Sequence, residues 1–103
     1  MPQRNREGER SAGGSADRER VTVFEREFRE DLRWWAETQP RVASRVLALV
    51  EATIRESFAG VGKPERLRFQ GASVWSRRIT QEHRLVYLVG DEQISFLQCR
   101  YHY

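Results

Sequence analysis

The spacing of the apolar positions changes once along the chain, from a helical to an extended pattern. Val21-Thr22-Val23 predicts a short strand. Apolar residues spaced by four, four and three positions then predict an amphipathic helix that ends before Pro40, namely Phe24, Phe28, Leu32 and Trp35. A second helix is predicted by the same spacing in Val42, Val46, Leu49, Val50, Ile54 and Phe58. We expect Gly60 and Gly62 to end it.

After Gly62 the pattern favours strands joined by short turns. Leu67 and Phe69 alternate with charged residues, and 70–73 reads as a turn. Residues 74–80 and 83–89 predict a hairpin with the two-residue loop Gln81-Glu82, and 93–101 predicts a last strand. Strands that follow one another through short turns pair antiparallel.

The predicted fold class is therefore α+β, in the order β-α-α-β-β-β-β. Two helices pack on one face of a twisted, mainly antiparallel sheet. Two short helices cover only one face, so the other face must be polar or used for binding. Arg77, Arg84 and Arg100 lie inside predicted strands, which suits a face open to solvent or to a polyanion.

Composition separates a tail from this domain and excludes several kinds of site. Residues 1–20 contain no aromatic and no branched aliphatic residue, so we expect a disordered tail before a domain over 21–103. Cys99 is the single cysteine of the 103 residues, which excludes an internal disulfide. With only two histidines beside it, a structural zinc site is not expected, and no cofactor is predicted. We expect neither a signal peptide nor a membrane-spanning segment.

The net charge of +3 is concentrated in one stretch. Residues 62–84 hold six basic and two acidic residues. Such a field favours a polyanion, most simply nucleic acid, although the same cluster also suits an ordinary solvated surface.

Three residues could cleave RNA without a metal ion. A ribonuclease needs a base for the ribose 2′-OH, a cation for the phosphorane and an acid for the leaving 5′-oxygen. Glu65, Arg84 and His102 have these chemistries. Each also has a plainer interpretation: a solvated loop carboxylate, a cross-strand ion-pair partner and an exposed histidine near the chain end.

A series of motifs resembles one family. Four segments are similar to the YoeB (Txe) toxins of the RelE superfamily, which are the messenger-cleaving partners of type II toxin–antitoxin pairs. These segments are Gly62-Lys63-Pro64-Glu65-Arg66-Leu67, WSRRIT at 75–80, EHRLVY at 82–87 and CRYHY at 99–103. The likeness covers 21–103 and implies a RelE-like fold. Residues 1–20 have no counterpart and are either a mis-assigned start or an extension.

The resemblance implies a role for each site residue. Glu65 matches the general base, Arg84 the arginine at the reacting phosphate, His102 the general acid and Tyr103 a supporting tyrosine. RNA contacts are expected from Lys63, Arg68, Arg77 and Arg78. Val61 stands where the family commonly has a lysine between two glycines, which removes one cation.

The implied function is a cytoplasmic, metal-independent endoribonuclease that cleaves ribosome-bound mRNA and inhibits translation. The implied partners are a YefM-like antitoxin, a second copy of the chain, and operator DNA through the antitoxin only. The alternative is a non-catalytic RNA-binding module or an antitoxin-dependent co-repressor. Cys99 is assigned to the core, and Trp75 either to the core or to stacking on RNA bases.

Overall fold

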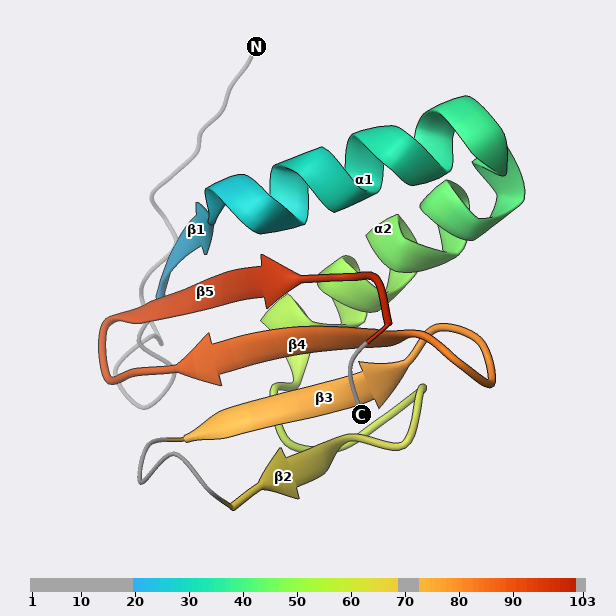
Figure 1. Cartoon of the computed structure of the whole chain (residues 1–103). Helices are drawn as coiled ribbons and strands as arrows, with labels where there is room; N and C mark the ends of the chain where they lie inside the picture. Colours follow the sequence, from blue (N-terminus) through green and yellow to red (C-terminus); the bar gives the residue numbers. More distant parts are fainter. Residues whose placement is uncertain (1–19, 69–72, 102–103) are drawn as a thin grey trace, which may run out of the picture.

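The computed structural model describes residues 20–68 and 73–101 as two helices on a five-stranded sheet (Figure 1). The sequence predictions for the tail, for 69–72 and for His102 and Tyr103 lie outside the described residues, apart from Arg20. The elements are β1 (Val21–Phe24), α1 (Arg26–Thr38), α2 (Pro40–Arg55), β2 (Glu65–Leu67), β3 (Val74–Arg78), β4 (Arg84–Val89) and β5 (Gln93–Gln98).

The strand order confirms the predicted fold class. The sheet runs β1-β5-β4-β3-β2, and β1 pairs parallel to β5 while all other neighbours are antiparallel. Both helices lie on the same side of this sheet (Figure 1). The α+β arrangement with two helices on one face of a mainly antiparallel sheet is therefore observed.

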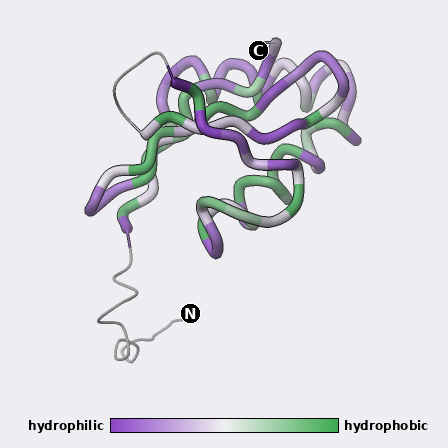
Figure 2. The backbone as a smooth tube through the Cα atoms, turned by 90° about the horizontal axis from the view of Figure 1, so that it is seen from below, coloured by the Kyte–Doolittle hydropathy of each residue, from purple (hydrophilic) through white to green (hydrophobic). Residues whose placement is uncertain are grey.

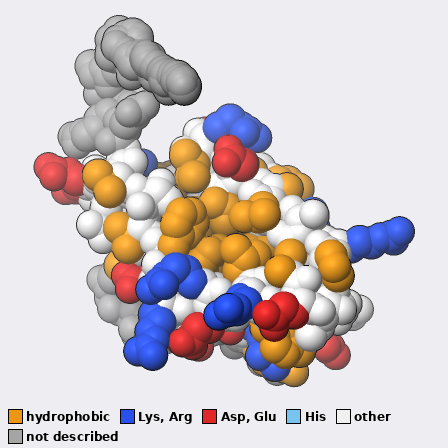
Figure 3. Space-filling view, turned by 90° about the horizontal axis from the view of Figure 1, so that it is seen from above, with side chains coloured by type: hydrophobic (Ala, Val, Ile, Leu, Met, Phe, Trp, Pro, Cys, Tyr) orange, Lys and Arg blue, Asp and Glu red, His pale blue; other side chains and the backbone are white. Residues whose placement is uncertain are grey.

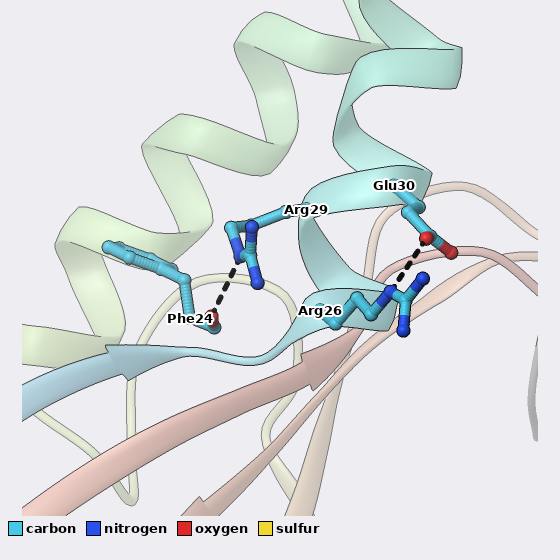
Figure 4. Close-up of polar contacts among 4 residues, drawn as sticks. All are labelled: Phe24, Arg26, Arg29 and Glu30. Atoms are coloured by element: carbon cyan, nitrogen blue, oxygen red, sulfur yellow. Dashed lines mark hydrogen bonds and ion pairs between the residues drawn. The ribbon is translucent and has the colours of Figure 1, made fainter.

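The helices form where the apolar spacing predicts them, with shifted ends. Phe24 belongs to β1, and α1 begins two residues later, where the side chain of Arg29 donates back to the Phe24 carbonyl and Arg26 pairs with Glu30 (Figure 4). Pro40 stands in the first turn of α2, where its missing N–H costs nothing.

Helix α2 ends at Arg55, five residues before the predicted glycine stop. Glu56 takes an extended backbone (φ −146°, ψ 99°), and Phe58 therefore packs from a loop against Trp75, at a ring distance of 5.0 Å. The prediction of a helix reaching Phe58 was wrong because a buried arginine side chain, described below, binds the carbonyls of this segment.

Two strand boundaries also differ from the prediction. The loop between β3 and β4 has five residues, Ile79–His83, rather than two, and the hydroxyl of Thr80 accepts the amides of Glu82 and His83 in place of a glycine turn. Strand β5 ends at Gln98 because the next amide, that of Cys99, donates to Asp31 on α1. Arg100 therefore lies after the sheet and not in it.

The core lies between the helices and the sheet. Side chains from three elements are at most 2% exposed there, among them Phe28 and Trp35 of α1, Val46 and Leu49 of α2 and Tyr87 of β4. Hydrophobic and hydrophilic segments alternate along the chain trace accordingly (Figure 2). Cys99 joins this core, as predicted, and Trp75 packs against it while partly buried. Within residues 20–68 and 73–101, no helix is both long enough and apolar enough to cross a membrane.

Candidate functional site

Glu65 is the first residue of β2, at the edge of the sheet. It is exposed, follows Pro64, and lies opposite Ser76 of β3. The preceding segment reaches this edge through two residues with positive φ, Gly62 (88°) and Lys63 (52°). The amide of Arg78 donates to the Gly62 carbonyl at 2.7 Å and so attaches the segment to β3 just before Glu65.

Arg77 corrects one sequence prediction. It was expected on an open sheet face as an RNA contact, but its side chain is fully buried. It donates to the Tyr87 hydroxyl (3.2 Å) and to the carbonyls of Val61 (2.8 Å), Ala59 (2.9 Å) and Glu56. The guanidinium therefore forms its hydrogen bonds inside the fold, where it holds the loop between α2 and β2.

Arg84 is the first residue of β4 and lies opposite Arg78 of β3. One of its terminal nitrogens, Nη1, donates to the carbonyls of Thr80, Gln81 and His83 at 3.0–3.2 Å. The side chain is half-buried, so the β3–β4 loop fixes the guanidinium at the end of the strand. A cation held this way loses little conformational freedom when it binds an anion.

The sheet register brings Glu65 and Arg84 to one face. Glu65 lies opposite Ser76, which lies opposite Val86, and Arg84 is two residues from Val86 on the same strand. Side chains alternate between the two faces of a strand, so both residues share the face turned away from the helices. With strands about 4.8 Å apart and a rise of about 3.3 Å per residue, their Cα atoms are about 12 Å apart.

On β3 and β4, the charged residues of this second face lie at one end. Ser76 and Val86 in its middle are buried, whereas Arg78 is exposed and Arg84 half-buried. Of the other cations predicted to bind RNA, Lys63 and Arg68 are exposed. The face is thus less open than the sequence predicted, and the accessible charges of β3 and β4 lie where β3 ends and β4 begins. Arg68 follows β2 at the opposite end of these strands.

The chain after β5 is held as an arm that we define as Cys99–Tyr101. Trp35 donates from Nε1 to the Cys99 carbonyl at 2.8 Å, and the Cys99 amide donates to Asp31 at 3.1 Å. The guanidinium carbon of Arg100 lies 3.7 Å from the ring centre of Trp34. At the far end, the Arg84 amide donates to the Tyr101 carbonyl at 3.0 Å.

His83 is a residue of this region to which the sequence analysis gave no role. The residue is 9% exposed, and its ring Nδ1 accepts the Tyr101 amide at 2.7 Å. The ring of Trp35 packs edge-on against it at 4.7 Å. No spacing signal reveals this contact, because it joins the β3–β4 loop to a segment 18 residues later.

Burial shifts the pKa values of three groups in this region. Burial raises the pKa of Asp31, and the Cys99 amide and Arg100 offset this only in part. Burial, with the nearby Asp31 charge, raises the pKa of the Cys99 thiol to about 12, so the thiol stays protonated at neutral pH. Burial likewise raises the pKa of Tyr87, the hydroxyl that accepts from Arg77 and donates to the Ser57 carbonyl.

Chemically, the arrangement offers a carboxylate and a guanidinium on one sheet face, and an arm anchored at the backbone amide of Arg84. This suits reaction at a phosphate, where a base and a fixed cation are both needed. In the part of the chain that the structure describes, no group of three or more His, Cys, Asp or Glu side chains is placed to hold a metal ion.

Comparison with known proteins gives one consistent family. The model of the YoeB-like toxin of bacterial type II toxin-antitoxin system matches residues 24–103. Toxin YoeB of Escherichia coli K12 is 43% identical over 81 residues, which are 79% of this chain and 96% of that protein.

Solved structures agree with this result. A YoeB dimer from Staphylococcus aureus superposes with a TM-score of 0.74 at 32% identity, covering 82% of this chain and 99% of its own. A heterotetrameric YoeB-YefM toxin-antitoxin complex from the same species gives 0.71 at 33% identity, with 82% and 98% covered.

Proposed function

This chain belongs to the YoeB-like toxins of bacterial type II toxin–antitoxin systems, and on that premise we propose that it is an endoribonuclease that cleaves messenger RNA on the ribosome. The observation that carries the proposal is the placement of Glu65 and Arg84 on one sheet face, with the arm that leads to His102 anchored at Arg84. The resemblance drawn from the sequence motifs is confirmed, and cleavage is the activity this site supports best.

The proposed reaction transfers the phosphate ester from the 5′-oxygen to the 2′-oxygen. Glu65 removes the proton of the ribose 2′-OH, and the 2′-oxygen attacks the adjacent phosphorus. Arg84 stabilises the extra negative charge of the phosphorane. His102 protonates the departing 5′-oxygen. The products are a 2′,3′-cyclic phosphate and a 5′-OH, and no metal ion takes part.

The separation of Glu65 and Arg84 fits the proposed substrate. A Cα distance of about 12 Å between Glu65 and Arg84 leaves space for one ribose-phosphate unit between a carboxylate and a guanidinium. The anchored arm ends at Tyr101, one residue before the proposed acid. Tyr103 is proposed to support the site.

Exposed cations around this centre and along the β2 edge are proposed to bind the RNA backbone. Lys63 precedes β2, Arg68 follows it, Arg78 ends β3, and all three are exposed. Phosphate contacts of this kind position RNA without reading its sequence. Arg77 is left out of this set because its guanidinium is buried.

The proposal extends to partners of the toxin. We propose a YefM-like antitoxin, self-association and operator DNA bound only through the antitoxin, on the precedent of the Staphylococcus complex and dimer. Hydrophobic side chains gather among charged ones on the molecular surface (Figure 3), and Leu47 and Ile54 of α2 are each at least 45% exposed. Apolar surface of this kind favours protein partners. A ribosomal substrate places the protein in the cytoplasm.

The test is cleavage of mRNA on programmed ribosomes. Relative to the unaltered chain, Glu65→Gln and His102→Gln should lower the cleavage rate by about 10²–10⁴-fold, the contribution typical of a general base or acid. Arg84→Ala should lower it by about 10²–10³-fold because charge stabilisation is lost. Matched controls are Glu37→Gln and Arg33→Ala, an exposed pair on α1, which should leave the rate unchanged.

The outcomes separate the candidate functions. Cleavage by the unaltered chain that the three variants lose supports the assignment. Cleavage that the variants retain means that the site residues are wrong. An unaltered chain that cleaves nothing, yet binds RNA or joins an antitoxin on DNA, favours the non-catalytic alternative.

A further inference from the structure

We propose that His83 is a positioning residue that sets the C-terminal arm and the Arg84 guanidinium relative to each other; this rests on the function proposed above. Two contacts of this one residue carry the inference. Its ring Nδ1 accepts the Tyr101 amide at 2.7 Å, and its backbone carbonyl accepts Arg84 Nη1 at 3.2 Å. His83 thus joins the proposed phosphate-binding cation to the segment that carries the proposed acid.

The backbone of Tyr101 needs such a contact. Tyr101 has φ 59°, in the left-handed region that non-glycine residues rarely adopt. Such conformations persist where the surroundings fix them. Here both polar backbone groups of Tyr101 are engaged, the amide by the His83 ring and the carbonyl by the Arg84 amide. The backbone of Tyr101 is therefore held by two adjacent residues, His83 of the β3–β4 loop and Arg84 of β4.

The His83 ring is itself held in place. The edge-on Trp35 ring lies at 4.7 Å on one side and the Tyr101 ring at 4.6 Å on another. The His83 amide donates to Thr80 Oγ1 at 3.2 Å, and the His83 carbonyl also accepts the Ile79 amide at 2.9 Å.

The contact also fixes the chemical state of the ring. A nitrogen that accepts a hydrogen bond has no proton, so the ring is a neutral imidazole with its proton on Nε2.

Two substitutions separate the acceptor from the packing. His83→Asn places an amide oxygen near the position of Nδ1 and keeps the acceptor while losing the ring. His83→Phe keeps a ring between Trp35 and Tyr101 but leaves the Tyr101 amide without its acceptor. A role in packing alone predicts that Phe is the milder change. A positioning role predicts that Asn is the milder change.

Hydrogen exchange and kinetics are measured together on the full-length chain. We expect the Tyr101 amide to be protected in the unaltered chain and in His83→Asn, and to exchange at least about tenfold faster in His83→Phe. In single-turnover cleavage on ribosomes, His83→Phe should lower the rate at saturating ribosome concentration by about 10–100-fold. The ribosome concentration that gives half of the maximal rate should change by no more than about twofold. His83→Asn should recover most of the loss.

A Phe variant that cleaves like the unaltered chain, or an Asn variant no better than Phe while both fold by circular dichroism, overturns the inference. If the Phe variant does not fold, the ¹⁵N shifts of the unaltered His83 ring decide: Nδ1 unprotonated supports the contact, Nδ1 protonated overturns it. If the unaltered chain cleaves nothing, the proposed function fails, and the exchange pattern of Tyr101 still shows whether His83 holds the arm.

Discussion

Asp31 shows what burial costs a single carboxylate that holds the arm. Its carboxylate accepts the Cys99 amide at 3.1 Å and so ends β5. Burial raises the pKa of Asp31, and the Cys99 amide and Arg100 lower it too little to bring it back to its ordinary value. The carboxyl group is therefore easier to keep in the fold when protonated than when charged.

This shift predicts a pH-dependent effect of Asp31→Asn. Asparagine keeps an oxygen for the Cys99 amide but carries no charge. As the pH rises above the unfolded pKa, the unfolded chain releases the Asp31 proton first, so the free energy of unfolding of the unaltered chain falls through the folded pKa. The variant lacks this loss. Urea unfolding between about pH 3 and about pH 7 should show the stability of the variant rising relative to the unaltered chain. A difference that is constant, or that grows toward acid pH, contradicts the proposed cause.

At the residue scale, the sequence predicted positions better than environments. Arg84 was expected in the strand predicted over 83–89, and it lies in β4. Arg77 was expected in the open, because an arginine in a strand is normally solvated. Burial of its guanidinium depends on carbonyls that the loop from Glu56 to Val61 supplies, and local patterns do not encode that loop. The role of His83 was missed for the same reason.

At the element scale, the loop between α2 and β2 depends on one side chain. The carbonyls of Glu56, Ala59 and Val61 all accept from the buried Arg77 guanidinium. The loop also passes very close to its neighbours at Gly62, where a Cβ would come within 3.1 Å of Arg77 Cβ and 3.0 Å of Leu49 Cδ2. Arg77 therefore binds a carbonyl at the C-terminal end of α2 and also carbonyls within the loop that follows.

Removing this guanidinium should destabilise the whole domain. Arg77→Met keeps the apolar stem but leaves several buried acceptors unpaired, which costs about 2–4 kcal/mol. The matched control is Arg78→Met, at the neighbouring exposed position, with an expected change within about 0.5 kcal/mol. Chemical denaturation measures both. Equal, small effects of the two substitutions would mean that water replaces the guanidinium and that the loop does not depend on it.

The limits of sequence-based prediction at this scale lie at the element ends. The apolar periods of α1 and α2 and the strands β3 to β5 follow from local spacing, and all of them form. The ends of α2, of the β3–β4 loop and of β5 shifted by between one and five residues. Each shift is set by a contact distant in sequence or by a side-chain hydroxyl: Arg77 for α2, Thr80 for the loop and Asp31 for β5.

At the scale of the whole molecule, the sheet separates the beginning of the domain from its site. β1 lies on one edge and β2, with Glu65, on the other. Short turns predict the antiparallel neighbours, but the parallel pairing of β1 with β5 joins segments about 70 residues apart and has no local signal. Arg20 Nε donates to the Gly90 carbonyl at 2.7 Å, so the domain begins near the β4–β5 turn.

This separation predicts opposite effects of protein fusions at the two ends. Arg84 begins β4 and Gly90 follows its last residue, so the two ends of that strand lie about 17 Å apart. A domain fused after Tyr103 extends the chain just beyond the anchored arm, and it should crowd the proposed acid and the RNA path. The same domain fused before Met1 enters near the β4–β5 turn.

We expect the first fusion to lower ribosome-dependent cleavage by about tenfold or more, since small displacements of reacting groups have effects of that size. The second fusion should cleave like the unaltered chain. Thermal unfolding of both fusions shows whether the domain is folded. Equal cleavage by two folded fusions would mean that the site does not need a free C-terminus after Tyr103.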